Sequence, residues 1–228
     1  MLNEVLENTE RFMSSVPKAK RKKYGQFFTN ATTAKFMASL FCFDLSKKQV
    51  DILDAGAGTG ILAAAVVQKL LESGYRGAIH ITCYETDELV LPLLEENMIL
   101  CNKLHNVSYT IKRENYITSQ NFSGYTLFNN ENYQYDYIIG NPPYMKIAKD
   151  AAEALAIPEV CYGAPNLYFL FWAMGIHNLK EEQANRFFDT TVSYGAQNRR
   201  ISLNSDVEEL VMFMQCGATD VFLTFTII

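Results

Sequence analysis

The sequence predicts an α/β protein in which helices cover both faces of a mostly parallel, twisted sheet. Short apolar runs typical of strands alternate with longer helical patterns between residues 50 and 179. Strands separated by helices form βαβ units, and the strands of such units are parallel. The chain has 228 residues, of which 49% are hydrophobic and 20% are charged. This length and composition suit one large domain, alone or with an extension, and exclude a disordered or collagen-like chain.

The order of the elements follows from hydrophobic periodicity and from residues that begin or end helices. An amphipathic helix is expected at 2–13, and a second helix, which Thr29 or Asn30 can cap, ends near Phe43. Strands are expected at 50–54, 78–84, 107–112 and 135–139. Further helices are expected at 61–73, 87–104 and 166–179. Beyond Glu181 the pattern weakens, and we expect a strand at 187–193, a helix at 206–215 and a strand at 221–228.

Composition also limits the function. The chain has no run of 18 apolar residues and an acidic, amphipathic start, so we expect no membrane span, no secretory signal and a cytoplasmic location. Five widely spaced cysteines and three scattered histidines do not form a zinc pattern, so no metal site is expected. The net charge of −5 argues against coating of nucleic acid over the whole surface, although residues 1–30 carry +3. Within them, the basic run 18–23 is either a phosphate contact or a solvated linker.

A glycine-rich turn, Asp54-Ala-Gly-Ala-Gly-Thr-Gly60, lies between an expected strand and an expected helix. Glycine accepts positive φ and lets a ligand approach the backbone closely. The spacing differs from the dinucleotide fingerprint and lacks the Lys-Ser/Thr of a P-loop, so triphosphate binding is not expected. A tight turn without a ligand remains the alternative. Glu85 follows the next strand, 25 positions beyond Gly60, where an acid can accept hydrogen bonds from a ribose diol.

The most informative motif is Asn141-Pro-Pro-Tyr144, directly after the apolar strand at 135–139. Two prolines stiffen the backbone and remove donors, and asparagine adds a side-chain acceptor. The oxygen of the Asn141 side chain and the carbonyl of Pro142 can together hold both hydrogens of a planar NH₂ group. Tyr144 offers a face on which an aromatic ring can stack. A rigid turn without chemistry is the alternative reading.

At these three segments, the chain resembles the class I S-adenosylmethionine-dependent methyltransferases. Among them it is most similar to the DNA N6-adenine methyltransferases of restriction–modification systems, over roughly residues 20–180. Gly25 to Thr29 resembles the family segment that folds over the methionine end of the cofactor, and its place before the glycine turn matches the gamma arrangement. Asn166 to Phe171 looks like the late motif that helps to wall the target-base pocket.

The resemblance implies a Rossmann-like methyltransferase fold, S-adenosylmethionine as cofactor and adenine-containing DNA as substrate. The catalytic residues implied are Asn141, Pro142, Pro143 and Tyr144. The cofactor-binding residues implied are Gln26, Phe27, Phe28, Thr29, Asp54, Gly56, Gly58, Gly60, Glu85, Asn115, Tyr116 and Asn141.

The sequence departs from the family pattern in three places. Asn30 stands where proline is common, and Asn115-Tyr116 stands where an acid–aromatic pair is frequent. Only about 48 residues follow the late motif, with no recognisable late strand motif among them. The late strands are therefore expected to be missing or altered. Either the chain is a truncated or shortened catalytic core, or recognition of DNA comes from a separate subunit or domain.

We therefore expect three parts in the chain. Residues 1–30 form a helix, a basic connector and a cofactor-closing segment, 31–181 form the catalytic domain, and 182–228 form a C-terminal extension of unassigned role. The expected activity is methylation of the N6 amine of a flipped-out adenine in DNA. Methylation of RNA adenine, methylation of a protein glutamine, and cofactor binding without activity remain alternatives.

Overall fold

The computed structural model describes residues 1–17, 29–41, 43–120, 135–143, 145–161, 165–179, 211–212 and 223–226. Its α-helices are α1 (Leu2–Ser15), α3 (Ala31–Ser39), α4 (Ile61–Glu72), α5 (Leu91–Asn102), α6 (Ala152–Ala156) and α7 (Leu167–Asn178), with a 3-10 turn η1 (Pro158–Val160). Its strands are β1 (Gln49–Ala55), β2 (Ala78–Tyr84), β3 (Val107–Lys112), β4 (Tyr137–Gly140), β5 (Val211–Met212) and β6 (Leu223–Thr226).

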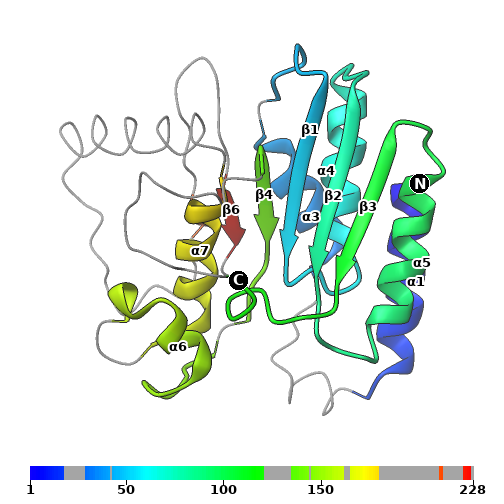
Figure 1. Ribbon diagram of the computed structural model, residues 1–228. Helices are drawn as coiled ribbons and strands as arrows, with labels where there is room; N and C mark the ends of the chain where they lie inside the picture. Colours follow the sequence, from blue (N-terminus) through cyan, green and yellow to red (C-terminus); the bar gives the residue numbers. More distant parts are fainter. Residues whose placement is uncertain are drawn as a thin grey trace.

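The strands form one sheet in the order β3-β2-β1-β4-β6-β5, most of which is visible in Figure 1. β1 is parallel to β2 and β4, β2 is parallel to β3, and β4 is parallel to β6. Only β5 runs antiparallel to its neighbour, β6. The predicted α/β class and mostly parallel sheet are confirmed, with late strands that are short.

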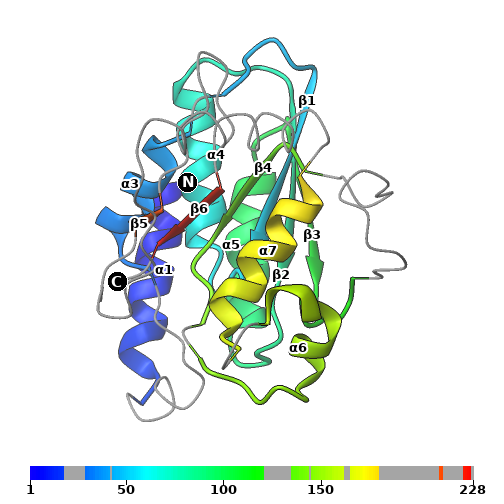
Figure 2. The same cartoon turned by 90° about the vertical axis from the view of Figure 1, so that its left-hand side faces the viewer.

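Helices cover both faces of the sheet (Figure 2). Alternate strand residues point to opposite faces, so Ile52 packs in one core and Leu53 in the other. The first core includes residues of α1, α3, α4 and α5, and the second includes residues of α7, with Ala156 of α6 packed against it. Because β1 and β4 are buried on both faces, their apolar runs are nearly continuous, as expected for central parallel strands.

The predicted C-terminal elements are partly corrected. Val211–Met212 is a strand, which contradicts the helix predicted at 206–215. These residues pair with β6, and this pairing with a distant strand outweighs the local helical pattern. The predicted strand at 221–228 is confirmed as the shorter β6, whereas the strand predicted at 187–193 lies outside the described residues.

The structure decides the capping residue of α3 and corrects the start of α5. Asn30, not Thr29, caps α3, because its side-chain oxygen accepts a hydrogen bond from the Thr33 amide at 2.8 Å. The helix predicted to begin at Asp87 begins at Leu91, because the Asp87 side chain accepts from the Leu89 amide at 2.8 Å and caps a separate turn. Among the described residues, no helix is both long enough and apolar enough to cross a bilayer.

Candidate functional site

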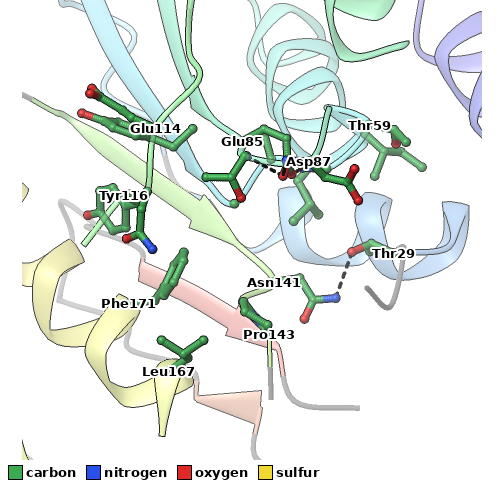
Figure 3. A pocket seen from close by; sticks show the side chains of 18 of the residues that line it. Thr29, Thr59, Glu85, Asp87, Glu114, Tyr116, Asn141, Pro143, Leu167 and Phe171 are labelled. Carbon is green, nitrogen blue, oxygen red and sulfur yellow. Dashed lines mark hydrogen bonds between the residues drawn. The ribbon is translucent and has the colours of Figure 1, made fainter. Parts of the chain in front are cut away.

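A cavity of about 540 Å³ opens at the carboxyl ends of the parallel strands (Figure 3). It is lined by the segments that follow β1, β2, β3 and β4, with α7 as a further wall. Open α/β sheets bind their ligands at this edge, and the volume is ordinary for a small-molecule site. The residues that line the cavity include Thr29, Gly56, Gly58, Glu85, Asn115, Tyr116, Asn141, Pro143, Leu167 and Phe171.

The glycine turn forms the wall between β1 and α4. Gly56, Gly58 and Gly60 all have positive φ, at 72°, 55° and 77°, which L-residues with side chains rarely adopt. A Cβ on Gly56 would lie 3.3 Å from a ring carbon of Phe171, within the cavity wall. A Cβ on Gly60 would lie 2.7 Å from the Met98 methyl, on the core side of the turn. Gly60 therefore serves packing against α5, and it does not line the cavity.

A buried polar network that the sequence did not reveal holds the glycine turn from behind. The Thr9 hydroxyl on α1 donates to the Thr59 hydroxyl at 3.0 Å, and the Asn97 amide on α5 donates to the Thr59 carbonyl at 2.8 Å. All three residues are at most 3% exposed. The sequence signal was the presence of two polar residues on otherwise buried helix faces. The network ties both helices to the loop that forms the cavity wall.

Replacing Asn97 with leucine should remove this tie, because leucine keeps the branching of the side chain but has no polar atoms. The Thr59 carbonyl would lose a buried donor, so we expect the free energy of unfolding to fall by about 1–3 kcal/mol. Urea denaturation measures the change, and Asn102→Leu, at an exposed position of the same helix, is the matched control. Equal stabilities of the two variants would contradict the role assigned to Asn97.

Glu85 joins the turn after β1 to the loop after β2. One carboxylate oxygen accepts from the Gly58 amide at 2.8 Å. The other oxygen accepts from the amides of Thr86 at 2.7 Å and Asp87 at 2.8 Å. Three backbone donors thus fix the carboxylate at the cavity wall, and the oxygen bound to Gly58 keeps a second lone-pair direction for a ligand hydroxyl.

Asp54 lies beneath the glycine turn and does not line the cavity. It is fully buried, and one of its oxygens accepts from the Ala63 amide at 3.0 Å. Within the described part of the chain, its other oxygen has no hydrogen-bond partner. Burial raises the pKa of Asp54 to about 7, the Ala63 amide lowers it, and the negative charge of Glu85 raises it further. Asp54 therefore contacts no ligand in the cavity. Its hydrogen bond from the Ala63 amide joins the end of β1 to the first turn of α4.

Asn115 and Tyr116 follow β3 and line the same cavity, but their polar atoms already have partners. The Asn115 amide oxygen accepts from the amides of Ile117 at 2.9 Å and Thr118 at 3.1 Å, and its nitrogen donates to Glu153 at 2.9 Å. Any contact of Asn115 with a ligand base would therefore use the remaining amide hydrogen, not the oxygen. The Tyr116 hydroxyl donates to Asn178 at 2.7 Å.

The ring of Tyr116 is part of an aromatic wall. Its centroid lies 5.1 Å from that of Tyr84 and 5.4 Å from that of Phe171. Burial and the nearby tyrosines raise the pKa of Tyr116 well above its ordinary value, so this phenol stays neutral. A neutral aromatic wall suits a flat, apolar ligand face.

Asn141 extends directly from the end of β4 into the cavity wall. Its amide nitrogen donates to the Thr29 hydroxyl at 3.2 Å, as the dashed line in Figure 3 shows. Pro143 also lines the cavity, whereas Pro142 is buried and is not among the lining residues. Gln26, Phe27, Phe28 and Tyr144, which the sequence assigned to this site, lie outside the described residues. Of the described candidates, only Asp54, Gly60 and Pro142 do not face the cavity.

No group of three or more histidine, cysteine or acidic residues could hold a metal ion in the described part of the chain. The site therefore consists of a glycine turn, a fixed carboxylate, an aromatic wall and an amide beside a proline pair. The model of the N-6 DNA methylase family matches residues 5–156, which contain all of these segments except α7.

The chain belongs to the N-6 DNA methylase family. It is 34% identical over 171 residues to the type II methyltransferase M.PstI of Providencia stuartii, a match that covers 73% of this chain and 33% of that protein. It is also 33% identical over 142 residues to a release factor glutamine methyltransferase of Fusobacterium nucleatum, covering 61% of this chain and 34% of that protein.

The fold has relatives among solved structures. A Listeria monocytogenes protein assigned to the class I S-adenosylmethionine-dependent methyltransferases superposes with a TM-score of 0.54 at 20% identity, covering 78% of this chain and 51% of that one. This match supports the Rossmann-like fold of the N-6 DNA methylase domain. The chain spans about a third of the length of the curated relatives that it matches.

Proposed function

We propose that this chain transfers the methyl group of S-adenosylmethionine to the exocyclic N6 amine of an adenine in DNA. The observation that carries the proposal is that Asn141 lines the same cavity as the glycine turn and Glu85, in a chain of the N-6 DNA methylase family. We further propose that the chain is the modification core of a restriction–modification system, acting in the cytoplasm.

The residues present fit the proposed cofactor. The absence of a Cβ at Gly56 keeps a narrow space open beside Phe171, and Glu85 offers a fixed carboxylate oxygen to a ribose hydroxyl. The rings of Tyr84, Tyr116 and Phe171 offer apolar surface to an adenine. In this proposal, Thr29 lies toward the methionine end. When bound, S-adenosylmethionine supplies an electrophilic methyl group.

The chain itself positions the acceptor nitrogen. In the proposed mechanism, the target adenine leaves the DNA stack, because a stacked base cannot reach a recessed cavity. In this proposal the Asn141 side-chain oxygen accepts one N6 hydrogen and Tyr144 stacks on the base. The Pro142 carbonyl would have to turn into the cavity to accept the other hydrogen, because Pro142 does not line it in this structure. This grip localises the lone pair on the nitrogen that attacks the methyl group. Most of the rate enhancement comes from proximity and electrostatic placement. No strong base is required, because the amine proton would become acidic only as the N–C bond forms and the methyl–sulfur bond breaks, and water can then take the proton.

Recognition of a target sequence is proposed to need more protein than the described domain. The curated relatives are about three times longer than the part that this chain matches. In addition, a methyltransferase subunit of a type I restriction–modification system from Streptococcus thermophilus has the same fold, with a TM-score of 0.50 at 19% identity. We propose that a further domain or a separate subunit supplies the base-specific contacts, whereas the basic run at 18–23 contacts phosphate.

One alternative has an observation in its favour. The glutamine methyltransferase relative is nearly as similar as M.PstI, although over fewer residues. A glutamine side chain presents the same planar NH₂ group as adenine, so the Asn141 corner could hold either. The Gly25 to Thr29 segment favours the DNA enzyme, because it resembles the segment of the DNA N6-adenine methyltransferases that folds over the cofactor.

Methyl transfer from labelled S-adenosylmethionine to three acceptors separates the candidates. DNA, RNA and a bacterial release factor are offered to the chain in parallel, and the methylated product is identified after digestion. N6-methyladenine in DNA is the expected product. Label in RNA or in the release factor would replace the proposal with the corresponding alternative, and cofactor binding without transfer to any acceptor would indicate a binding remnant.

The proposed ribose contact predicts the effect of Glu85→Gln. The substitution replaces one acceptor oxygen with a donor amide that faces backbone N–H groups, so the side chain has to turn from its present position. We expect the Kd for S-adenosylmethionine, measured by calorimetry, to rise by roughly tenfold or more, as a lost charge-assisted hydrogen bond implies. Glu88→Gln, which also lines the cavity wall but makes no described contact with the turn, is the control. Unchanged affinity in Glu85→Gln would contradict the ribose role.

A further inference from the structure

We propose that Glu153 is a positioning residue for the cofactor, because it holds the loop after β3 in place through the side chain of Asn115. This inference rests on the proposed function, and within it on S-adenosylmethionine as the cofactor. Glu153 lies on α6 and is not among the residues that line the cavity, whereas Asn115 is. The contact that carries the inference is the 2.9 Å hydrogen bond that the Asn115 amide nitrogen donates to the Glu153 carboxylate.

The partners of Asn115 leave its amide only one orientation. Its oxygen accepts from the backbone amides of Ile117 at 2.9 Å and Thr118 at 3.1 Å, and these groups can only donate. An ionised carboxylate, on the other side, can only accept. A half-turn of the Asn115 amide would set its NH₂ group against two N–H groups and its oxygen against the Glu153 carboxylate. The hydrogen bond between Asn115 and Glu153 therefore has a fixed donor and a fixed acceptor.

Asn115 in turn holds the aromatic part of the cavity wall. The bonds to its side-chain oxygen close the turn that contains Tyr116. The ring of Tyr116 lies against the rings of Tyr84 and Phe171, which the proposed function assigns to the adenine of the cofactor. Loss of the hydrogen bond that steadies Asn115 should therefore shift this wall.

The other end of the contact belongs to a packed part of the chain. Ala154, next to Glu153 on α6, is 2% exposed, and α6 lies beside α7 in both ribbon views (Figures 1 and 2). The segment before α6 is held to the start of α7, because the Leu167 amide donates to the Met145 carbonyl at 3.0 Å. Glu153 therefore joins the loop after β3 to the packed segment that follows Pro143.

Glu153→Ala removes the acceptor, whereas Glu153→Gln keeps a carbonyl oxygen that can accept from Asn115. We expect Glu153→Ala to raise the Kd for S-adenosylmethionine, measured by calorimetry without DNA, roughly fivefold to tenfold, as loss of one hydrogen bond implies. Glu153→Gln should bind the cofactor within about threefold of the unmodified chain. Asp150→Ala removes an exposed acid just before α6 and is the matched control for the lost charge.

Exchanging the roles of the two residues tests the contact itself. Asn115→Asp keeps an acceptor for the two backbone amides but sets a second carboxylate against Glu153, so we expect the Kd to rise roughly tenfold or more. In Asn115→Asp/Glu153→Gln, the glutamine NH₂ group can donate to the aspartate, and the Kd should return to within about threefold of the unmodified value. A double variant that binds as weakly as Asn115→Asp would overturn the inference, because the cofactor would then need the Asn115 amide itself and not its contact with Glu153.

The side-chain NH₂ signal of Asn115 reads the contact without the cofactor. In ¹⁵N-labelled protein, this signal is identified by its absence from the spectrum of Asn115→Asp. Glu153→Ala should shift the signal, and Asp150→Ala should leave it near its original position. Dispersed backbone signals in the same spectrum show that the variant is folded, so that a raised Kd is not due to unfolding. An unchanged NH₂ signal in Glu153→Ala would overturn the inference.

These outcomes differ from those that test the proposed function. Cofactor binding needs no acceptor, so a chain that methylates neither DNA, RNA nor the release factor would lose the proposed function, while the Kd values still decide the role of Glu153. An unchanged Kd in Glu153→Ala would overturn the positioning role and leave the proposed function standing. A raised Kd in Glu153→Ala, with rescue by Glu153→Gln and by the exchanged pair, supports the inference.

Discussion

Asn141→Ala is expected to abolish methyl transfer while leaving the binding of S-adenosylmethionine nearly intact. The substitution removes the side-chain acceptor of the proposed amine grip and leaves the glycine turn and Glu85 unchanged. Removal of one placed polar group from a reacting centre typically lowers kcat by about 10²–10³-fold. The same or a larger loss is expected here, because the Pro142 carbonyl alone cannot hold both hydrogens of the amine.

The measurement compares kcat with labelled cofactor and DNA against the Kd of the cofactor from calorimetry. Asn102→Ala, at an exposed position of α5, controls for the loss of an asparagine elsewhere in the domain. If Asn141→Ala transfers methyl groups at a near-normal rate, the amide does not hold the acceptor. If it instead loses cofactor affinity and keeps kcat, Asn141 belongs to the cofactor site alone.

The sequence predicted those parts of the site whose conformation is determined within one short segment. The glycine turn needs positive φ, and the structure has it at Gly56, Gly58 and Gly60. Glu85 and Asn141 follow apolar parallel strands, so the sheet itself brings them to one edge. Periodicity predicts such strands well because each is buried on both faces.

The parts that the sequence did not predict depend on contacts between distant segments. Nothing in the sequence near Thr9 indicates that its hydroxyl will bond to the Thr59 hydroxyl. Nothing near Asn97 indicates that its amide will donate to the Thr59 carbonyl. The same holds for β5, whose strand conformation comes from pairing with β6 and not from its local pattern. Asn30 is an intermediate case, since its capping role was one of two local possibilities and the structure selects it.

As the pH rises, the free energy of unfolding of Asp54→Asn is expected to increase relative to that of the unmodified chain. The pKa of Asp54 is raised from 3.8 to about 7 in the folded protein, so the folded chain binds more protons than the unfolded chain between these values. The contribution of this group to stability is therefore largest below pH 4, falls as the pH rises toward 7, and stays low above it. Asparagine carries no charge at any of these pH values and does not show this fall.

Urea denaturation at pH 5, 6, 7 and 8 measures the difference in free energy of unfolding between Asp54→Asn and the unmodified chain. A shift of about three pKa units corresponds to about 4 kcal/mol across the full range, which sets the order of magnitude. Asp150→Asn, at an exposed position, is the control for the loss of one carboxylate. The Glu85 charge is one cause of the raised pKa, so in a Glu85→Gln background the pH dependence due to Asp54 should become smaller. A difference that stays constant from pH 5 to 8 would mean that Asp54 is already ionised at the lower pH, and it would contradict the raised pKa.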